Sequence, residues 1–296
     1  MTKDLKRVAE SYRVASGKKF RVESCDPGDT GGLDISKKKA NALLAAGVEK
    51  LADLQTRLYA QDCWSLLLVF QAMDAAGKDS TIKHVMSGIN PQGCQVVSFK
   101  APSPQELDHD FLWRGNRDLP ERGRIGIFNR SHYEEVLVVR VHPKILDGQH
   151  LPPGLVGKDV WKKRYASIND WERHLSENGT RILKFFLQVS KEEQRKRFLE
   201  RLEVPEKNWK FAMGDVLERG FWDDYMRAYE DAISATSTEW APWYAVPADH
   251  KWFTRLVVAQ VVISELESLH LQYPKVDAKR KKELEEARKE LEKEKG

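Results

Sequence analysis

Residues 64–85 of this chain read WSLLLVFQAMDAAGKDSTIKHV, and this stretch decides the fold. Its apolar run, Leu66 to Phe70, is short enough for a strand and continuous enough to be buried on both faces, as in a parallel sheet. A small-residue loop follows and leads through a lysine into residues typical of a helix. Such a junction binds phosphate, because the loop amides and the positive helix N-terminus face an anion. The predicted phosphate-binding residues are Ala75, Ala76, Gly77, Lys78, Asp79, Ser80 and Thr81.

Two positions depart from the usual P-loop pattern. Ala72 stands where the first glycine is expected, and Asp79 replaces the Ser or Thr that normally reaches magnesium. Asp74 lies inside the loop, where its carboxylate would repel phosphates unless a cation lay between them. We therefore interpret Asp74 as the acid that holds Mg²⁺, with Mn²⁺ as an alternative ion. The other interpretation is an ordinary strand–turn–helix junction with a solvated aspartate.

Composition narrows the class of protein. With 296 residues and 41% hydrophobic content, the chain is long enough for one large domain with appendages. The net charge is only +4, so any basic function must come from local clustering. Three cysteines without CxxC spacing argue against a disulfide framework or zinc site and for a reducing compartment. Since no apolar run reaches membrane-spanning length and no signal-peptide core is present, we expect a soluble, cytoplasmic protein with no membrane partner.

The chain divides into three parts. Residues 1–35 form a polar, turn-rich N-terminal arm, expected to lie over the body or a neighbour rather than join the core. Residues 36–273 alternate strands with helices, which predicts an α/β fold of the P-loop kinase-like, three-layer α/β/α type with a parallel, roughly five-stranded sheet. Residues 274–296 are a charged tail, either a solvated helix or a frayed end. The predicted strands are 66–70, 94–99, 124–129, 181–189 and 243–246.

The third predicted strand ends in Asn129 and Arg130, where ligands of such sheets bind. P-loop enzymes usually place an acid here for magnesium, whereas this chain has an amide. Asn129 can still coordinate a metal through its carbonyl oxygen, with Glu134 or Glu135 supplying charge, and Arg130 is expected to face the transferred phosphate. A strand-end cap beside a surface cation is the alternative. The predicted catalytic residues are Asp74, Lys78, Asn129 and Arg130, with Asn129 or Glu134 as further metal ligands.

Basic residues cluster in two further segments. Residues 190–222 lie between the fourth and fifth strands, where kinases of this fold place a mobile lid. Several cations along a cleft suit a long polyanion, although an amphipathic surface helix with Phe198 and Leu202 inward is an equal alternative. The predicted lid residues are Arg197, Arg201, Lys207 and Lys210. Asp108, His109, Asp110 and Trp113 are expected to shape a nucleotide pocket, with a helix that turns Leu107, Phe111 and Leu112 inward as an equal alternative. The predicted nucleotide-binding residues are Lys100, Asp108, Arg114, Arg117 and Glu134.

Four blocks of this sequence, in order, resemble polyphosphate kinase family 2, the polyphosphate-dependent nucleotide phosphotransferases. They are MDAAGKDSTIKHVMSGINPQG (73–93), KAPSPQELDHDFLWR (100–114), IFNRSHYEEVLVVRVHP (127–143) and PEKNWKF (205–211). The resemblance covers roughly residues 20–270 and is greatest to the subgroup called class III, associated with phosphorylation of both AMP and ADP. It implies that Asp74 binds magnesium, that Lys78 is the loop lysine, and that the lid cations face a polyphosphate channel. Asn129-Arg130 matches a motif that is Asp-Arg in many members, and the methyl group of Ala72 is expected to alter the loop slightly.

We therefore expect reversible, Mg²⁺-dependent transfer of a phosphoryl group between inorganic polyphosphate and nucleoside mono- or diphosphates. The resemblance implies adenine nucleotides, with guanine as an alternative, and a homo-oligomer, either a dimer or a tetramer. Two other functions stay open: an ATP-dependent nucleotide kinase, and a non-catalytic P-loop protein that binds a polyanion or nucleic acid. Nucleic-acid binding ranks last, because no platform of interleaved aromatic and basic residues is present.

Overall fold

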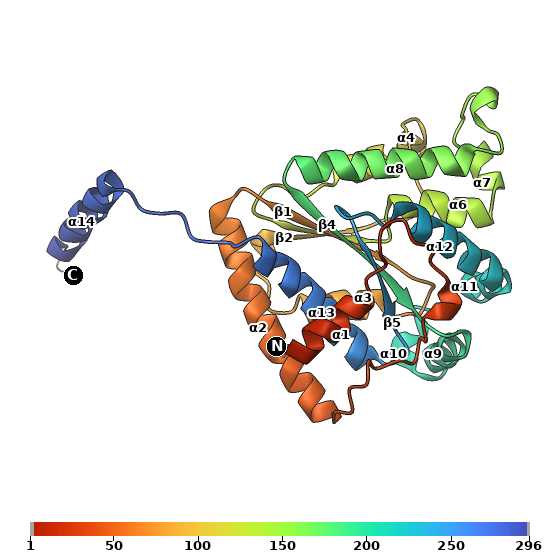
Figure 1. Ribbon diagram of the computed structural model, residues 1–296, viewed down its shortest axis with the longest axis horizontal. Helices are drawn as coiled ribbons and strands as arrows, with labels where there is room; N and C mark the ends of the chain where they lie inside the picture. The colour runs from red at the N-terminus through yellow and green to blue at the C-terminus, as the bar shows by residue number, and fades with distance from the viewer. Residues whose placement is uncertain (1–2, 295–296) are drawn as a thin grey trace.

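A five-stranded sheet in the order β2-β3-β1-β4-β5, with every neighbouring pair parallel, forms the middle layer of the protein. It is seen in a computed structural model that describes residues 3–294 (Figure 1). The central strand β1 is buried at every position, as its unbroken apolar run predicts. The predicted parallel α/β fold is confirmed. The strands are β1 Ser65–Gln71, β2 Cys94–Ser98, β3 Ile125–Asn129, β4 Thr180–Gln188 and β5 Trp243–Pro247.

Helices cover both faces of the sheet (Figure 1). One layer packs α13 against α1, α2 and α3, and the other packs α12 against α6 and α8. The first layer is α1 Lys3–Ser11, α2 Lys37–Gln61, α3 Lys78–Val85 and α13 Lys251–Ser268, and the second is α6 Val138–Val141, α8 Val160–Glu177 and α12 Trp222–Thr236. The other α-helices are α4 Pro104–Leu107, α5 Trp113–Arg117, α7 Lys144–Asp147, α9 Lys191–Glu203, α10 Pro205–Asn208, α11 Met213–Glu218 and α14 Ala278–Lys293. The 3₁₀ helices are η1 Val22–Ser24, η2 Pro91–Gly93, η3 His132–Val136, η4 Pro153–Leu155 and η5 Arg219–Phe221.

The N-terminal arm joins the core. Leu5, Val8 and Ala9 of α1 are buried, and Phe20 is buried beside Phe186 with ring centroids 6.4 Å apart. The expectation that this segment stays outside the core is therefore wrong. The physical reason is that a short helix needs only three apolar residues at helical spacing to bury one face, and the surrounding charges hide that pattern in the composition.

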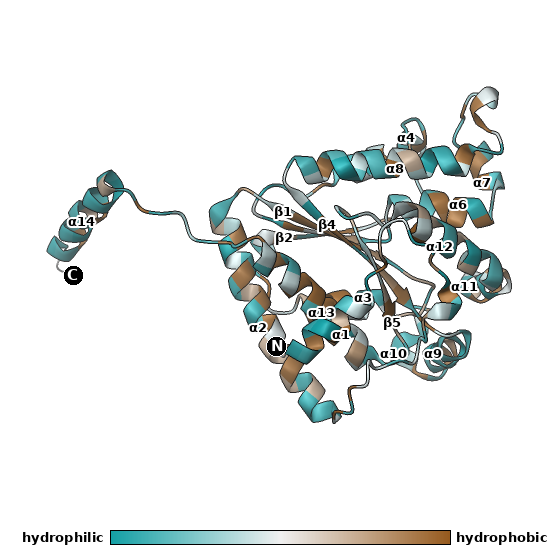
Figure 2. Cartoon of the chain, in the orientation of Figure 1, coloured by the Kyte–Doolittle hydropathy of each residue, from teal (hydrophilic) through white to brown (hydrophobic). Residues whose placement is uncertain are grey.

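The charged C-terminal segment forms a helix that stands away from the body. α14 begins after Asp277, whose side chain accepts a hydrogen bond from Arg280 N, and none of its residues is buried. It is hydrophilic along its length, in contrast to the strands at the centre of the protein (Figure 2). Among residues 3–294, no helix combines the length and the apolar character needed to cross a membrane.

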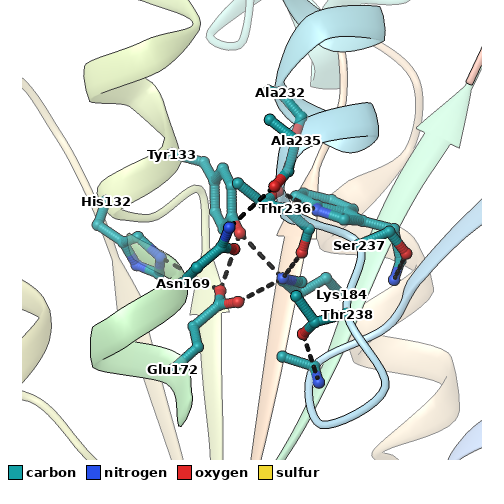
Figure 3. A network of polar contacts seen from close by, with 12 residues as sticks. His132, Tyr133, Asn169, Glu172, Lys184, Ala232, Ala235, Thr236, Ser237 and Thr238 are labelled. Carbon is teal, nitrogen blue, oxygen red and sulfur yellow. Dashed lines mark hydrogen bonds and ion pairs between the residues drawn. The ribbon is translucent and has the colours of Figure 1, made fainter. Parts of the chain in front are cut away.

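A buried polar network joins the segment after β3 to the second helix layer (Figure 3). Lys184 Nζ on β4 donates hydrogen bonds to Glu172 at 2.5 Å, to Tyr133 Oη at 3.0 Å and to the Thr236 carbonyl at 2.8 Å. Burial favours a raised pKa for Glu172, but the Lys184 ammonium and His132 outweigh it and hold that pKa below its ordinary value. Lys184 and Glu172 therefore form an ion pair that anchors Tyr133, three residues after Arg130.

We predict that Lys184→Met destabilises the protein by about 3–5 kcal/mol, because Glu172 is left as a buried, unpaired charge. The free energy of unfolding from urea titration is the measurement. Lys162→Met removes an exposed lysine of α8 and is expected to leave stability unchanged. The double variant Lys184→Met/Glu172→Gln, which removes both charges, should recover most of the loss. A loss in Lys184→Met as small as that of the control contradicts the prediction.

Candidate functional site

A cleft of about 490 Å³ opens where β1, β2 and β3 end. Parallel α/β sheets bind ligands at this edge. The loop after β1 forms one wall, the ends of β2 and β3 form another, and the segment between β4 and α12 lies over them. The lining residues are Asp74, Ala75, Ala76, Gly77, Lys78, Asp79, Ser80, Ser98, Phe99, Lys100, Asn129, Arg130, Arg197, Glu200, Arg201, Lys207, Lys210 and Lys251. Most of the predicted phosphate-binding loop is therefore in the cleft, whereas Thr81 is buried behind it.

The phosphate loop turns sharply between β1 and α3. Ala75 and Gly77 have φ angles of 60° and 105°, and the alanine accepts a left-handed conformation that usually favours glycine. Lys78, the first residue of α3, is buried, and its Nζ donates to the Ala72 carbonyl at 2.9 Å. Burial lowers the pKa of Lys78, and the nearby Arg130 guanidinium lowers it further. Ala72 itself is buried and does not line this cleft, but it lines a small neighbouring cavity with Asp74 and Arg130.

Arg130 connects the two predicted motifs. Its guanidinium donates to Asp74 Oδ1 at 2.6 Å and to Glu134 Oε2 at 3.0 Å. Burial alone would lower the pKa of Arg130, but Glu134 and Asp74 outweigh it and raise that pKa. Its backbone has a φ of 59°, a left-handed conformation that directs the side chain back across the loop. Arg130 thus lines the cleft while two carboxylates of this chain hold its charge.

The carboxylates at the cleft differ in their surroundings. Asp74 is 28% exposed, whereas Asp79 accepts a hydrogen bond of 2.7 Å from Asn129 Nδ2. Glu134 faces a small neighbouring cavity with Asp74 and Arg130, and Glu135 is buried against Arg164. Within residues 3–294, no three acidic, histidine or cysteine side chains form a metal cluster. The donor set fits an ion that takes one or two carboxylate ligands here and its other ligands from water and a phosphate, which is how Mg²⁺ usually binds.

The lid residues have separate surroundings, although all four line the cleft. Arg197 is 6% exposed, and its guanidinium donates to the carbonyls of residues 75, 76, 248 and 249, so it binds backbone. Arg201 pairs with Asp215 at 3.4 Å, and Lys210 stacks over Trp209 at 4.9 Å. Lys207 pairs with Glu200. Phe198 is buried, but Leu202 is 49% exposed, so the alternative that turned both inward is wrong for Leu202.

The predicted nucleotide residues do not gather in one place. Lys100 lines the cleft, and its carbonyl accepts a hydrogen bond from Arg114 at 2.7 Å. Arg114 lines a second cavity of about 70 Å³ with Glu106 and Phe111. Arg117 pairs with Asp118, Asp108 is exposed and lines neither cavity, and Glu134 belongs with Arg130. Arg114 and Arg117 both pair with Glu106 Oε1, at 3.3 and 3.4 Å, so the structure brings Lys100, Arg114 and Arg117 together. Asp108 and Glu134 take no part in these contacts.

Sequence reasoning missed several residues at the cleft. Ser98 ends β2, and Lys251 begins α13 just after β5, so the rule that ligands bind at strand ends could have identified both. Burial lowers the pKa of Lys251, and Arg197 lowers it further. Arg255, whose guanidinium donates to Ser80 Oγ at 2.8 Å, lies on a long helix and carries no sequence signal.

Comparison with known proteins gives a consistent result. The family model of polyphosphate kinase 2 matches residues 34–274. An ADP-polyphosphate phosphotransferase of Rhodopseudomonas palustris is 56% identical over 97% of this chain and 99% of its own length. An AMP/ADP-polyphosphate phosphotransferase of Meiothermus ruber is 48% identical over 90% of this chain and 95% of its own length. The crystal structure of polyphosphate kinase 2 from Arthrobacter aurescens superposes with a TM-score of 0.84 at 44% identity, covering 94% of this chain and 95% of that one. These matches confirm the family resemblance and the fold expected from the sequence.

We predict that Asn129→Asp makes stability depend on pH in magnesium-free buffer. The new carboxylate at position 129 lies opposite Asp79, at the 2.7 Å now spanned by a hydrogen bond, and like charges raise the pKa of such a pair. A raised folded-state pKa means that stability is retained at low pH and lost as pH rises. The free energy of unfolding from thermal denaturation should equal that of wild type at about pH 4 and be lower than it by about 1 kcal/mol at about pH 8.

Asn129→Ala, which removes the donor without adding a charge, is the control for this variant. The control should show a deficit that varies less with pH than that of Asn129→Asp, because it adds no second carboxylate. An Asn129→Asp deficit that varies with pH no more than that of Asn129→Ala would contradict the predicted contact between positions 129 and 79.

Proposed function

Because this chain belongs to the polyphosphate kinase 2 family, we propose that it transfers a terminal phosphoryl group from inorganic polyphosphate to AMP and ADP, in a reversible reaction. The observation that carries the proposal is the cleft itself. The phosphate loop, the end of β3 and the lid all place cationic side chains around one space. A cleft of this kind suits a chain of phosphates far better than a neutral ligand.

Each group in the cleft has a physical role in this reaction. In-line phosphoryl transfer needs little covalent chemistry from the protein, so positioning and charge stabilisation supply most of the rate. The amides at the start of α3 and the Lys78 ammonium hold phosphate oxygens, and Arg130 stabilises charge that develops during transfer. Lys207, Lys210 and Lys251 line the part of the cleft that would receive the remaining polyphosphate.

We propose that the reaction requires Mg²⁺, with Mn²⁺ as a substitute. Asp74 is the residue that would hold the ion, and Glu134 lies behind it across Arg130. When bound, the ion would supply positive charge that offsets the negative charge of the phosphates. Asn129 is less suited to this role, because its amide nitrogen faces Asp79 and only its carbonyl oxygen could bind metal.

The finer assignments rest on the same site. We propose adenine as the base, with guanine as an alternative, and we place the nucleotide beside Lys100 and Arg114, which are joined by a hydrogen bond. We also propose a cytoplasmic homo-oligomer, either a dimer or a tetramer. Size-exclusion chromatography with light scattering tests the oligomer, and competition between AMP and GMP tests the base.

An end-point assay tests the reaction directly. Purified protein, magnesium and long-chain polyphosphate are incubated with AMP or ADP in separate tubes, and the nucleotides are resolved by chromatography. ATP from ADP, with ADP and then ATP from AMP, supports the proposal. Transfer to AMP from ATP, without transfer from polyphosphate, would instead support an ATP-dependent kinase. Failure of transfer in every tube, with folded protein, would support a non-catalytic polyanion-binding protein.

We predict that Asp74→Asn lowers kcat by ~10²-fold, because one preorganised charge at the reacting phosphate is lost. The initial rate of ATP formation at saturating polyphosphate and ADP is the measurement. Because the change also removes the ion pair to Arg130, melting temperatures are compared in parallel. Asp170→Asn is the matched control, since Asp170 is 68% exposed on α8, and it should turn over like wild type. Near-full turnover by Asp74→Asn contradicts the metal assignment.

A further inference from the structure

We propose that Gln194 and Arg219 are positioning residues that couple the lid to the phosphate loop. Neither touches the cleft; they act by setting which way the loop backbone faces. The inference rests on the proposed function, because it takes the loop after β1 as the site where phosphate binds. It adds that the base of the lid sets how tightly this loop binds an anion.

Every carbonyl group of the loop, residues 72–77, accepts a hydrogen bond from a donor of the protein. The Ala72 carbonyl accepts from Lys78 Nζ, and the Met73 and Gly77 carbonyls accept from the amides of Ala76 and Thr81. The remaining three carbonyls, of residues 74, 75 and 76, accept from side chains of α9. Half of the loop carbonyls are therefore oriented by the helix that begins the lid.

The amide groups have the opposite environment. Within residues 3–294, the N–H groups of Gly77, Lys78 and Asp79 donate to no protein acceptor. They belong to the first turn of α3, whose amides cannot bond within the helix. A trans peptide unit holds its N–H opposite its C=O, so the α9 donors on the carbonyls of residues 74, 75 and 76 fix the directions of the N–H groups of residues 75, 76 and 77. Of these, the Ala76 N–H donates to the Met73 carbonyl, whereas within residues 3–294 those of Ala75 and Gly77 donate to no protein acceptor and are left to bind an anion.

Gln194 fits this role through both ends of its amide. It is 1% exposed, its Nε2 donates to the Asp74 carbonyl at 2.9 Å, and its Oε1 accepts from Arg219 Nη1 at 2.6 Å. Rotating the amide would place oxygen against oxygen and nitrogen against nitrogen, so only one orientation satisfies both contacts. Arg197, one turn further along α9, holds the next two carbonyls at 3.1 and 2.8 Å.

Arg219 brings the far end of the lid into this contact. It lies in η5, after α10 and α11, and its Nη1 also donates to the Lys191 carbonyl at 3.0 Å. The lid begins at Ser190, and its far end returns to the start of α9 through Arg219. Arg219 donates to Gln194, and Gln194 in turn donates to the Asp74 carbonyl. A change in lid position that moves Arg219 therefore acts on the residue that orients the loop.

Four variants separate this role from general folding. Gln194→Met loses both contacts, Gln194→Glu keeps the acceptor for Arg219 but loses the donor to Asp74, and Arg219→Met keeps only the contact between Gln194 and Asp74. Arg195→Met is the matched control, because it also removes one arginine charge, and among residues 3–294 Arg195 pairs only with the exposed Glu192. Binding of inorganic tripolyphosphate is measured by calorimetry in magnesium-free buffer. Melting temperatures and kcat for ADP phosphorylation are measured beside it.

We expect both Gln194 variants to bind tripolyphosphate about tenfold more weakly than wild type, as the loss of one buried hydrogen bond implies. Arg219→Met should weaken binding several-fold beyond Arg195→Met, with a melting temperature like that of the control. Wild-type binding by Gln194→Glu or Gln194→Met overturns the positioning role. Equal binding by Arg219→Met and Arg195→Met overturns the coupling to the lid, and this result does not depend on whether the buried Gln194 variants fold.

The outcome is distinguishable from failure of the proposed function. If wild type and the variants bind tripolyphosphate in the expected order of affinity but wild type transfers no phosphoryl group, the proposed reaction fails and the positioning role stands. If wild type turns over and the Gln194 variants both bind and turn over like it, only the positioning role fails.

Discussion

The register of β1 between its two neighbours is the constraint on which the site depends. Phe70 lies opposite Asn129 on β3 and opposite Phe185 on β4, and its carbonyl accepts a hydrogen bond of 3.0 Å from Arg130 N. The phosphate loop begins two residues later, so the pairing of buried strands sets the distance between the loop and Arg130. A shift of register would break the contact of Arg130 with Asp74 and that of Asn129 with Asp79 together.

Several cations of the cleft are paired with acids of the same chain. Arg130 pairs with Asp74 and Glu134, Arg201 pairs with Asp215, and Lys207 pairs with Glu200. Unpaired cations in one cleft would repel one another, so these acids stabilise the folded protein without a bound anion. Burial raises the pKa of Asp215 and the charge of Asp74 raises it further, although Arg201, Arg130 and Lys78 act in the opposite direction. A polyanion in the cleft would compete with these acids for the same cations, among them Arg201 and Lys207 of the lid.

Patterns within a few consecutive residues were enough to predict the sheet and the phosphate loop. The unbroken apolar run of β1 and the small-residue loop before Lys78 identified the sheet and the phosphate loop, because burial and helix geometry act over a few residues. The N-terminal helix was missed because three apolar residues are hidden among charges. Arg197 lines the cleft, but the sequence does not show that its guanidinium is bound to four backbone carbonyls. Periodicity assigns a residue to a helix face, but it does not say which backbone that face will meet.

The sequence by itself determined the order of strands and helices, the phosphate loop, and the family, since each of these is written in contiguous residues. Only the tertiary structure decided the partners: Arg130 with two acids, Lys184 with Glu172, and Gln194 between Asp74 and Arg219. Only the tertiary structure showed that Arg114 donates a hydrogen bond to the Lys100 carbonyl, and that Asp108 does not line the cavity that Arg114 lines. These contacts join residues far apart in the chain, and their energies depend on burial and distance, which no local pattern specifies.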